Sequence, residues 1–95
     1  MASYRLSGRA DEDLGRLYEY GIIHYGLERA DRYYNGLIER FEELAENPQL
    51  WQAVDHIRSG YRRSVYGRHS IYYRIDPDAI VIVRILGRQD LKQLQ

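Results

Sequence analysis

The last third of the chain, residues 61–87, constrains the fold most strongly because three strand-like runs follow one another there. These runs cover residues 61–65, 69–75 and 79–87, and they are rich in Tyr, Ile and Val. Gly67 and the sequence Asp76-Pro77-Asp78 separate them. Such a pattern is typical of β-strands joined by tight turns. We therefore expect an antiparallel sheet in this part of the chain.

The alternation of the middle run predicts how it pairs with the last run. If Asp76–Asp78 alone forms the loop, Ile75 pairs with Ala79, Tyr73 with Val81 and Ile71 with Val83. This register puts the apolar residues of both strands on one face. The opposite face would be half apolar and half basic, so it needs a cover of more chain or a partner. It would carry Tyr72, Ile80 and Ile82 beside Ser70, Arg74 and Arg84.

The pairing of residues 61–65 with the middle run stays open at this stage. A two-residue turn at Gly67-Arg68 and a bulged turn would place opposite faces of this strand toward the core.

Two helices are expected before the sheet. The first runs from about Ala10 to Tyr25 and the second from about Glu28 to Glu46, because apolar residues recur three and four positions apart in both. Only Gly26 and Leu27 connect the helices, so they must form an antiparallel hairpin. A short strand-like run, Tyr4–Leu6, precedes them. We predict a single domain, residues 1–95, of the α+β class: a two-layer fold with an N-terminal helical hairpin packed on a small antiparallel sheet.

The charges cancel over the whole chain but are unevenly distributed. Residues 1–55 carry six Arg and eleven Asp or Glu, whereas residues 56–95 carry eight Arg or Lys and three Asp. A basic half is usually a solvated face, and otherwise it indicates an anionic partner. The chain has no Cys, and neither a signal peptide nor an 18-residue apolar segment stands out. We expect a cytoplasmic protein that is not associated with a membrane.

The sequence offers little chemistry of its own. His24, His56 and His69 lack the spacing of metal ligands, and no glycine pattern that cradles phosphate is present, so we expect no metal site and no cofactor. His69 and Ser70 are neighbours on a strand, and their side chains point to opposite faces. Arginines that could hold an RNA phosphate are plentiful, but no acid–base pair accompanies them clearly. We therefore predict no catalytic residues.

A series of short motifs extends along nearly the whole chain: Asp13-Leu14, Leu17 and Tyr20, then Ala30, Leu37, Phe41, Leu44 and Asn47-Pro48, then 58–62, 72–75, 83–86 and 88–90. Together these motifs resemble the ParE family of bacterial toxins, which shares its fold with the RelE ribonucleases. Each motif is weak alone, but their order and spacing are fairly specific. One position departs from many relatives, which have His directly after the final strand's Leu, where this chain has Gly87.

The resemblance implies a non-enzymatic toxin of a type II toxin–antitoxin system that inhibits DNA gyrase. The implied partner is a ParD-like ribbon-helix-helix antitoxin, in an assembly of two toxins and two antitoxins that contacts operator DNA through the antitoxin. The alternative is a RelE-like, ribosome-dependent mRNA endonuclease, and a third hypothesis is an interaction domain without toxicity.

Two sets of contact residues follow from these expectations. Apolar and basic residues on the sheet face away from the hairpin, and on the helix edges, are predicted to bind the antitoxin: Tyr18, Ile22, Tyr33, Arg58, Tyr72, Ile80, Ile82 and Leu86. Basic residues of the last strand and residues of the tail are predicted to contact the target: Arg84, Arg88, Asp90 and Leu91. Leu91 and Leu94 are three positions apart, which suits one helical turn against another surface.

Overall fold

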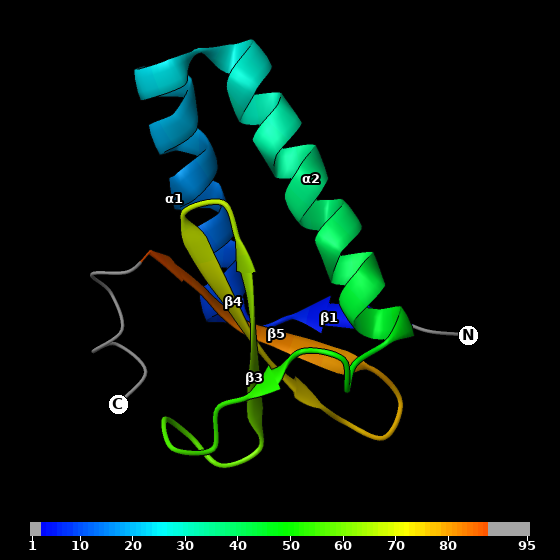
Figure 1. Ribbon diagram of the computed structural model, residues 1–95. Coiled ribbons are helices and arrows are strands. Elements are labelled where there is room, and N and C mark those ends of the chain that lie inside the picture. Colours follow the sequence, from blue (N-terminus) through cyan, green and yellow to red (C-terminus); the bar gives the residue numbers. More distant parts are fainter. Residues whose placement is uncertain (1–2, 88–95) are drawn as a thin grey trace.

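A computed structural model describes residues 3–87 and shows two helices packed on a five-stranded sheet (Figure 1). The elements are β1 (Tyr4–Leu6), α1 (Gly8–Tyr25), α2 (Leu27–Glu46), β2 (Gln52–Ala53), β3 (Tyr61–Tyr66), β4 (His69–Ile75) and β5 (Ile80–Gly87). The strand order is β1-β5-β4-β3-β2. The pairing is antiparallel except for β1, which runs parallel to β5 at one edge. The predicted two-layer α+β fold is confirmed, and the sheet is mixed because of β1.

Local capping explains where the helices begin and end. The side-chain oxygen of Ser7 accepts a hydrogen bond from the Ala10 backbone N–H at 3.0 Å, so α1 starts two residues earlier than its apolar pattern indicates. Gly26, with φ +90°, lies between the helices, and its N–H donates to the Ile22 carbonyl at 3.0 Å. A positive φ favours glycine, and this single residue lets the chain reverse direction into α2.

The predicted register of β4 with β5 is wrong. The loop has four residues rather than three, because the Asp76 N–H donates to the Ala79 carbonyl at 2.9 Å and Ile75 pairs with Ile80. A bulge then breaks the ladder, so that Tyr73 pairs with Ile82 but Tyr72 pairs with Arg84. Ile80 and Ile82 therefore lie beneath the helices and not on the face away from them.

The structure also resolves the register of β3. Tyr66 pairs with His69 across a two-residue turn at Gly67-Arg68, and Ser64 pairs with Ile71. Ser64 is fully buried, and its hydroxyl accepts a hydrogen bond from Arg40 Nη1 of α2 at 2.7 Å. Of the two turns considered, the tight one is present.

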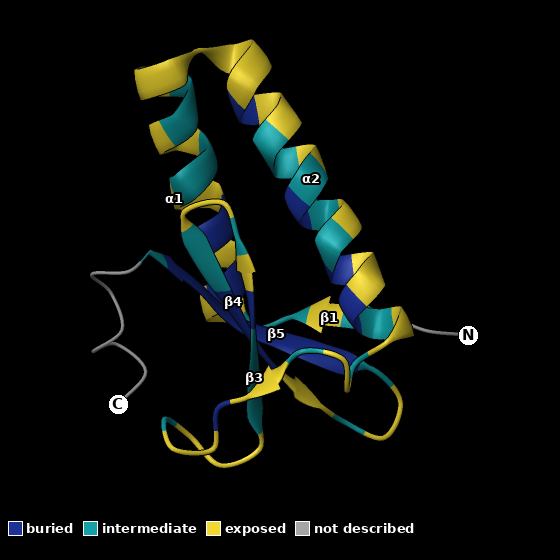
Figure 2. Cartoon of the chain, viewed as in Figure 1, coloured by how far each residue is buried: buried dark blue, intermediate teal, exposed yellow. Residues whose placement is uncertain are grey.

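Both faces of the sheet carry a hydrophobic core. On the helix side, residues of α1, α2, β4 and β5 pack together: Ala10, Leu14, Leu37, Phe41, Leu44, Ile71, Tyr73, Ile80, Ile82 and Ile85. On the other side a smaller core forms from Val54, Tyr72, Val81, Val83 and Leu86, with Ile57 and Tyr61 packed against it. The connector between β2 and β3 therefore covers the second face, and Figure 2 shows β5 buried along most of its length.

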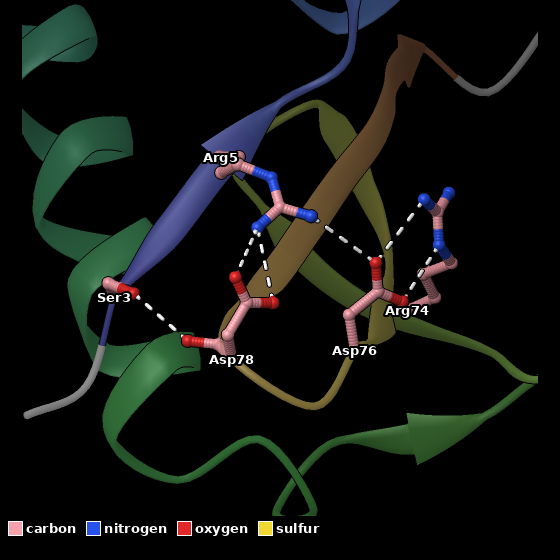
Figure 3. A network of polar contacts seen from close by, with 5 residues as sticks. All are labelled: Ser3, Arg5, Arg74, Asp76 and Asp78. Carbon is pink, nitrogen blue, oxygen red and sulfur yellow. Dashed lines mark hydrogen bonds and ion pairs between the residues drawn. The ribbon is translucent and has the colours of Figure 1, made fainter.

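A polar network joins the edge strand β1 to the β4–β5 loop (Figure 3). Arg5 lies 3.3 Å from Asp76 and 3.3 Å from Asp78, and Arg74 also pairs with Asp76 at 3.1 Å. Ser3 donates a hydrogen bond to the Asp78 carbonyl at 3.4 Å. All of these contacts are exposed, so they connect the elements at the surface.

Candidate functional site: a groove at the tip of the helical hairpin

A groove of about 1100 Å³ opens between the upper parts of the two helices and the turn that joins β3 to β4. Its lining comes from all three of these elements and from the end of β5: Leu17, Tyr18, Tyr20, Gly21, Tyr25, Arg29, Ala30, Arg32, Tyr33, Tyr66, Gly67, Arg68, His69 and Gly87. Within the part of the chain that the structure describes, the lining contains three arginines and one histidine but no carboxylate. Aromatic rings and guanidinium groups thus face a shared space.

Two tyrosines fix the β3–β4 turn against α2. The Tyr33 hydroxyl lies over Gly67, where an added Cβ would be 2.6 Å from that oxygen, and the Tyr66 hydroxyl lies over Gly36, where a Cβ would be 1.7 Å away. Gly67 also has φ +55°, a conformation that favours glycine. Tyr33 of α2 therefore needs a glycine in the β3–β4 turn, and Tyr66 of β3 needs a glycine in α2. We call these four residues the tyrosine–glycine lock.

Hydrogen bonding around Tyr33 indicates that the Nδ1 atom of His69 carries a proton. The Tyr33 hydroxyl lies 2.9 Å from the Tyr66 carbonyl oxygen, 2.7 Å from His69 Nδ1 and 3.3 Å from the Arg68 backbone nitrogen. A hydroxyl has one proton to donate, and the carbonyl is an acceptor only, so Tyr33 donates to Tyr66 and accepts from Arg68 and from His69 Nδ1–H. Burial raises the pKa of Tyr33, which keeps that proton in place. These hydrogen bonds join Tyr33 of α2 to the β3–β4 turn.

The base of α1 is joined to β5 by a buried ion pair between Asp13 and Arg84. Arg84 Nε donates to Asp13 Oδ2 at 2.8 Å and Arg84 Nη2 donates to Asp13 Oδ1 at 3.1 Å. Asp13 also accepts from the Ile85 backbone N–H at 3.0 Å and pairs with Arg16. The exposed fractions of Asp13 and Arg84 are only 3% and 7%. Arg84, predicted to contact a target, is buried here and its charge is paired with that of Asp13.

The structure separates the predicted antitoxin contacts instead of bringing them together. Tyr18 and Tyr33 line the groove and Ile22 is half-buried on α1, while Arg58 is exposed on the connector. The other four are buried on both faces of the sheet: Ile80 and Ile82 under the helices, Tyr72 and Leu86 in the second core. Burial inside the chain's own cores leaves little of these four for a partner to contact.

Three of the predicted target contacts, Arg88, Asp90 and Leu91, lie outside the described residues. The sequence analysis predicted neither the groove nor the buried ion pair of Asp13 with Arg84. A carboxylate inside the apolar stripe, between Ala10 and Leu14, was the available signal for a buried ion pair. No comparable sequence signal predicts the groove, because its lining residues are far apart in the chain.

Residues 3–87 offer neither a metal centre nor a membrane-spanning helix. No group of three His, Cys, Asp or Glu side chains there is placed to hold a metal ion. Neither α1 nor α2 combines the length and apolar character that crossing a bilayer requires.

Comparison with known proteins places the chain in a family. The family model for the ParE toxin of the type II toxin–antitoxin system parDE matches residues 4–91. Toxin ParE1 of Caulobacter vibrioides is 37% identical over 86 residues, which cover 90% of this chain and 88% of the relative. Toxin RelE3 of the same organism is 33% identical over 90 residues, covering 90% of this chain and 92% of the relative.

A solved structure supports the fold independently. The chromosomal ParDE toxin–antitoxin system from P. aeruginosa contains a chain that superimposes with a TM-score of 0.78 at 21% sequence identity, covering 92% of this chain and 96% of that chain. At that identity the likeness speaks for the fold alone. The family match and the sequence relatives go further, and the chain belongs to the ParE family of toxins from type II toxin–antitoxin systems.

Proposed function

We propose that this toxin stops growth by inhibiting DNA gyrase, without catalysing a reaction of its own. The observation that supports this proposal is the match to the ParE model from residue 4 to residue 91, nearly the whole chain. The gyrase target itself comes from the family resemblance and not from a contact in the structure.

The burial of the candidate catalytic groups supports a non-enzymatic mechanism. Cleaving RNA without a metal requires arginines at the phosphate and an acid–base pair that reaches the ribose. Arg84 is held by Asp13, and Tyr72 is 2% exposed in the second core. His69 is engaged with Tyr33 through Nδ1. These groups do not converge on one phosphate site.

We further propose that a ParD-like antitoxin covers the aliphatic side chains at the outer end of the helical hairpin. Ile23 and Leu27 are 75% and 58% exposed, and Ile22 beside them is half-buried. Contiguous aliphatic side chains without a cover are typical of a protein-binding surface. Tyr18 and Tyr33 lie at the groove border of this surface, and Arg58 on the connector is a separate candidate contact.

Target contact is assigned to the tail, residues 88–95, on the strength of the sequence. Removing Gln89–Gln95 should abolish inhibition of gyrase but leave antitoxin binding nearly intact. A truncated chain that folds, binds its antitoxin and still inhibits gyrase would exclude the tail from the mechanism.

Two assays on the purified chain separate the proposed function from its alternative. We expect gyrase to introduce fewer negative supercoils into relaxed plasmid when the chain is present. We also expect mRNA to stay intact when the chain is added to translating ribosomes. The match to Toxin RelE3 makes the second assay necessary. Codon-specific mRNA cleavage with unimpaired supercoiling would replace this proposal with the ribonuclease function.

A further inference from the structure

We propose that the groove at the hairpin tip binds single-stranded nucleic acid, with its arginines on the phosphates and its exposed tyrosines stacked on bases. This inference goes beyond gyrase inhibition, because it assigns a ligand class to a surface that the proposed function does not use as a whole.

The charge of the lining favours an anionic ligand. Arg29, Arg32 and Arg68 line the groove together with His69, and among residues 3–87 no Asp or Glu does. Among residues 3–87, neither Arg29 nor Arg68 has an ion-pair partner. Arg32 lies 3.6 Å from Glu28, but both side chains are more than two-thirds exposed, so this pair holds the arginine only weakly. In a chain with equal numbers of acidic and basic side chains, this local excess is distinctive.

Aromatic residues line the groove on two sides, and two of those on α1 are more exposed than those beside the β3–β4 turn. Tyr20 and Tyr25 on α1 are 56% and 47% exposed, and the Tyr20 ring stacks at 4.0 Å on the His24 ring. Their remaining ring surface faces solvent and the groove. On the opposite wall the tyrosine–glycine lock holds Tyr33 and Tyr66 in place. Exposed rings beside a basic groove are the usual elements of single-strand binding, because every base offers a face for stacking.

The same lining argues against an amphipathic peptide helix as the occupant. A peptide helix inserts Leu or Ile side chains into aliphatic pockets. Of the described lining residues, only Leu17 and Ala30 are aliphatic and larger than glycine, and Ala30 is 4% exposed. The exposed aliphatic residues Ile23 and Leu27 lie outside the lining. Bases and phosphates match the groove better than aliphatic side chains do.

Fluorescence anisotropy of labelled oligomers tests this proposal on the purified full chain. The probes are oligo(dT) and oligo(rU) of about 12 nucleotides, an abasic oligomer with the same phosphates, and oligo-glutamate of equal length. We expect saturable binding of at least one base-containing oligomer. The abasic and oligo-glutamate probes should bind at least about tenfold more weakly, because stacking contributes to each bound base. The two sugar types show whether the groove distinguishes DNA from RNA.

Variants locate the binding. Arg29→Ala combined with Arg68→Ala should weaken binding at least about tenfold and lower the salt slope by roughly 1.4, about 0.7 per lost phosphate contact. Arg9→Ala, which removes one exposed positive charge on α1 outside the lining, should leave the affinity within about twofold. Tyr20→Ala should weaken binding of the base-containing oligomers and leave abasic binding unchanged.

Several results would overturn the proposal. One is no saturable binding of either base-containing oligomer at low salt. A second is equal affinity for the abasic probe, which would show that charge alone acts. A third is tighter binding of oligo-glutamate, which would reassign the groove to an acidic protein segment. Circular dichroism of each variant, which should match the parent because every changed residue is on the surface, confirms that lost binding is not lost folding.

Discussion

The two halves of α1 have opposite surroundings although they belong to one continuous helix. Its first half is capped by Ser7, buries Ala10 and Leu14, and is joined to β5 through Asp13. Its second half exposes Tyr20, Ile23 and Tyr25. Figure 2 shows the same change along the hairpin, from buried at the sheet to exposed at the tip.

The difference indicates that stability and recognition are assigned to different ends of the molecule. The base lies over the sheet, where strands from distant parts of the chain converge. Toward the tip the two helices approach each other closely at Gly21, where an added Cβ would lie 3.3 Å from the Ala30 Cβ. Side chains at the tip are therefore available to partners.

Removing the carboxylate at the base should have the largest effect. Asp13→Ala leaves Arg84 buried without its partner, so we expect a loss of about 3–5 kcal/mol in the free energy of unfolding. Urea denaturation followed by circular dichroism measures it. Asp11→Ala, an exposed change on the same helix, should cost less than about 1 kcal/mol. Similar losses for both variants would show that the ion pair does not anchor the base.

Two glycine-to-alanine changes should shift stability in opposite directions. Gly36→Ala places a Cβ 1.7 Å from the Tyr66 hydroxyl, and we expect a net loss of about 1–2 kcal/mol after the gain in helix propensity. Gly15→Ala meets no atom within 4 Å and should stabilise the chain by roughly 0.5–1 kcal/mol. Thermal unfolding compares them. A stabilising Gly36→Ala would mean that Tyr66 moves aside freely, and that the tyrosine–glycine lock is loose.

The sequence pattern predicted both helices, four of the five strands and the two layers, since each of these depends on residues close in sequence, whereas β2 was not predicted. The pattern could not predict the β4–β5 register. The choice between a three-residue and a four-residue loop depends on one backbone hydrogen bond at Asp76, and the bulge near Val83 leaves no mark on the apolar pattern. The placement of Ile80 and Ile82 failed for this reason.

The candidate site was harder to predict because its contacts join distant positions. Asp13 and Arg84 are 71 residues apart, and Tyr33 reaches a turn 33 to 36 residues away. Neither contact follows from spacing along one element. From the sequence, Arg84 was predicted to be a surface cation on a strand. In the folded chain it is buried, because it pairs with Asp13 of α1.

Ionisation of the Tyr73 hydroxyl should lower the free energy of unfolding at alkaline pH. Burial raises the pKa of Tyr73 to about 12, and the hydroxyl donates to the Pro48 carbonyl at 2.6 Å. Because the folded pKa exceeds the unfolded value of about 10, the stability from this group is fully present below about pH 10 and is lost as pH rises toward 12. Tyr73→Phe should cost about 1 kcal/mol near neutral pH.

The difference in the free energy of unfolding between Tyr73→Phe and the parent chain reports on Tyr73 alone, because the other tyrosines are the same in both. It should shrink and then change sign as the pH rises from about 10 to about 12, because the parent loses stability in this range and phenylalanine has no proton to lose. Denaturant titrations across that range provide the measurement. A constant difference at all pH values would mean that Tyr73 ionises equally in the folded and unfolded chain.

The smallest effect is expected at the exposed network that joins β1 to the β4–β5 loop. Arg5 is 50% exposed and pairs with Asp76 and Asp78 at 3.3 Å, and Asp76 retains Arg74 when Arg5 is removed. Arg5→Ala should therefore cost less than about 1 kcal/mol, because exposed ion pairs gain little over solvation. The parallel pairing of β1 with β5 should persist, since Ser7 N–H still donates to the Ile82 carbonyl at 2.9 Å. Unfolding at about 0.05 and 1 M NaCl is the decisive comparison, because screening should remove most of the difference between Arg5→Ala and the parent. A loss above about 2 kcal/mol that salt does not reduce would instead show that the Arg5 stem packs as part of the base.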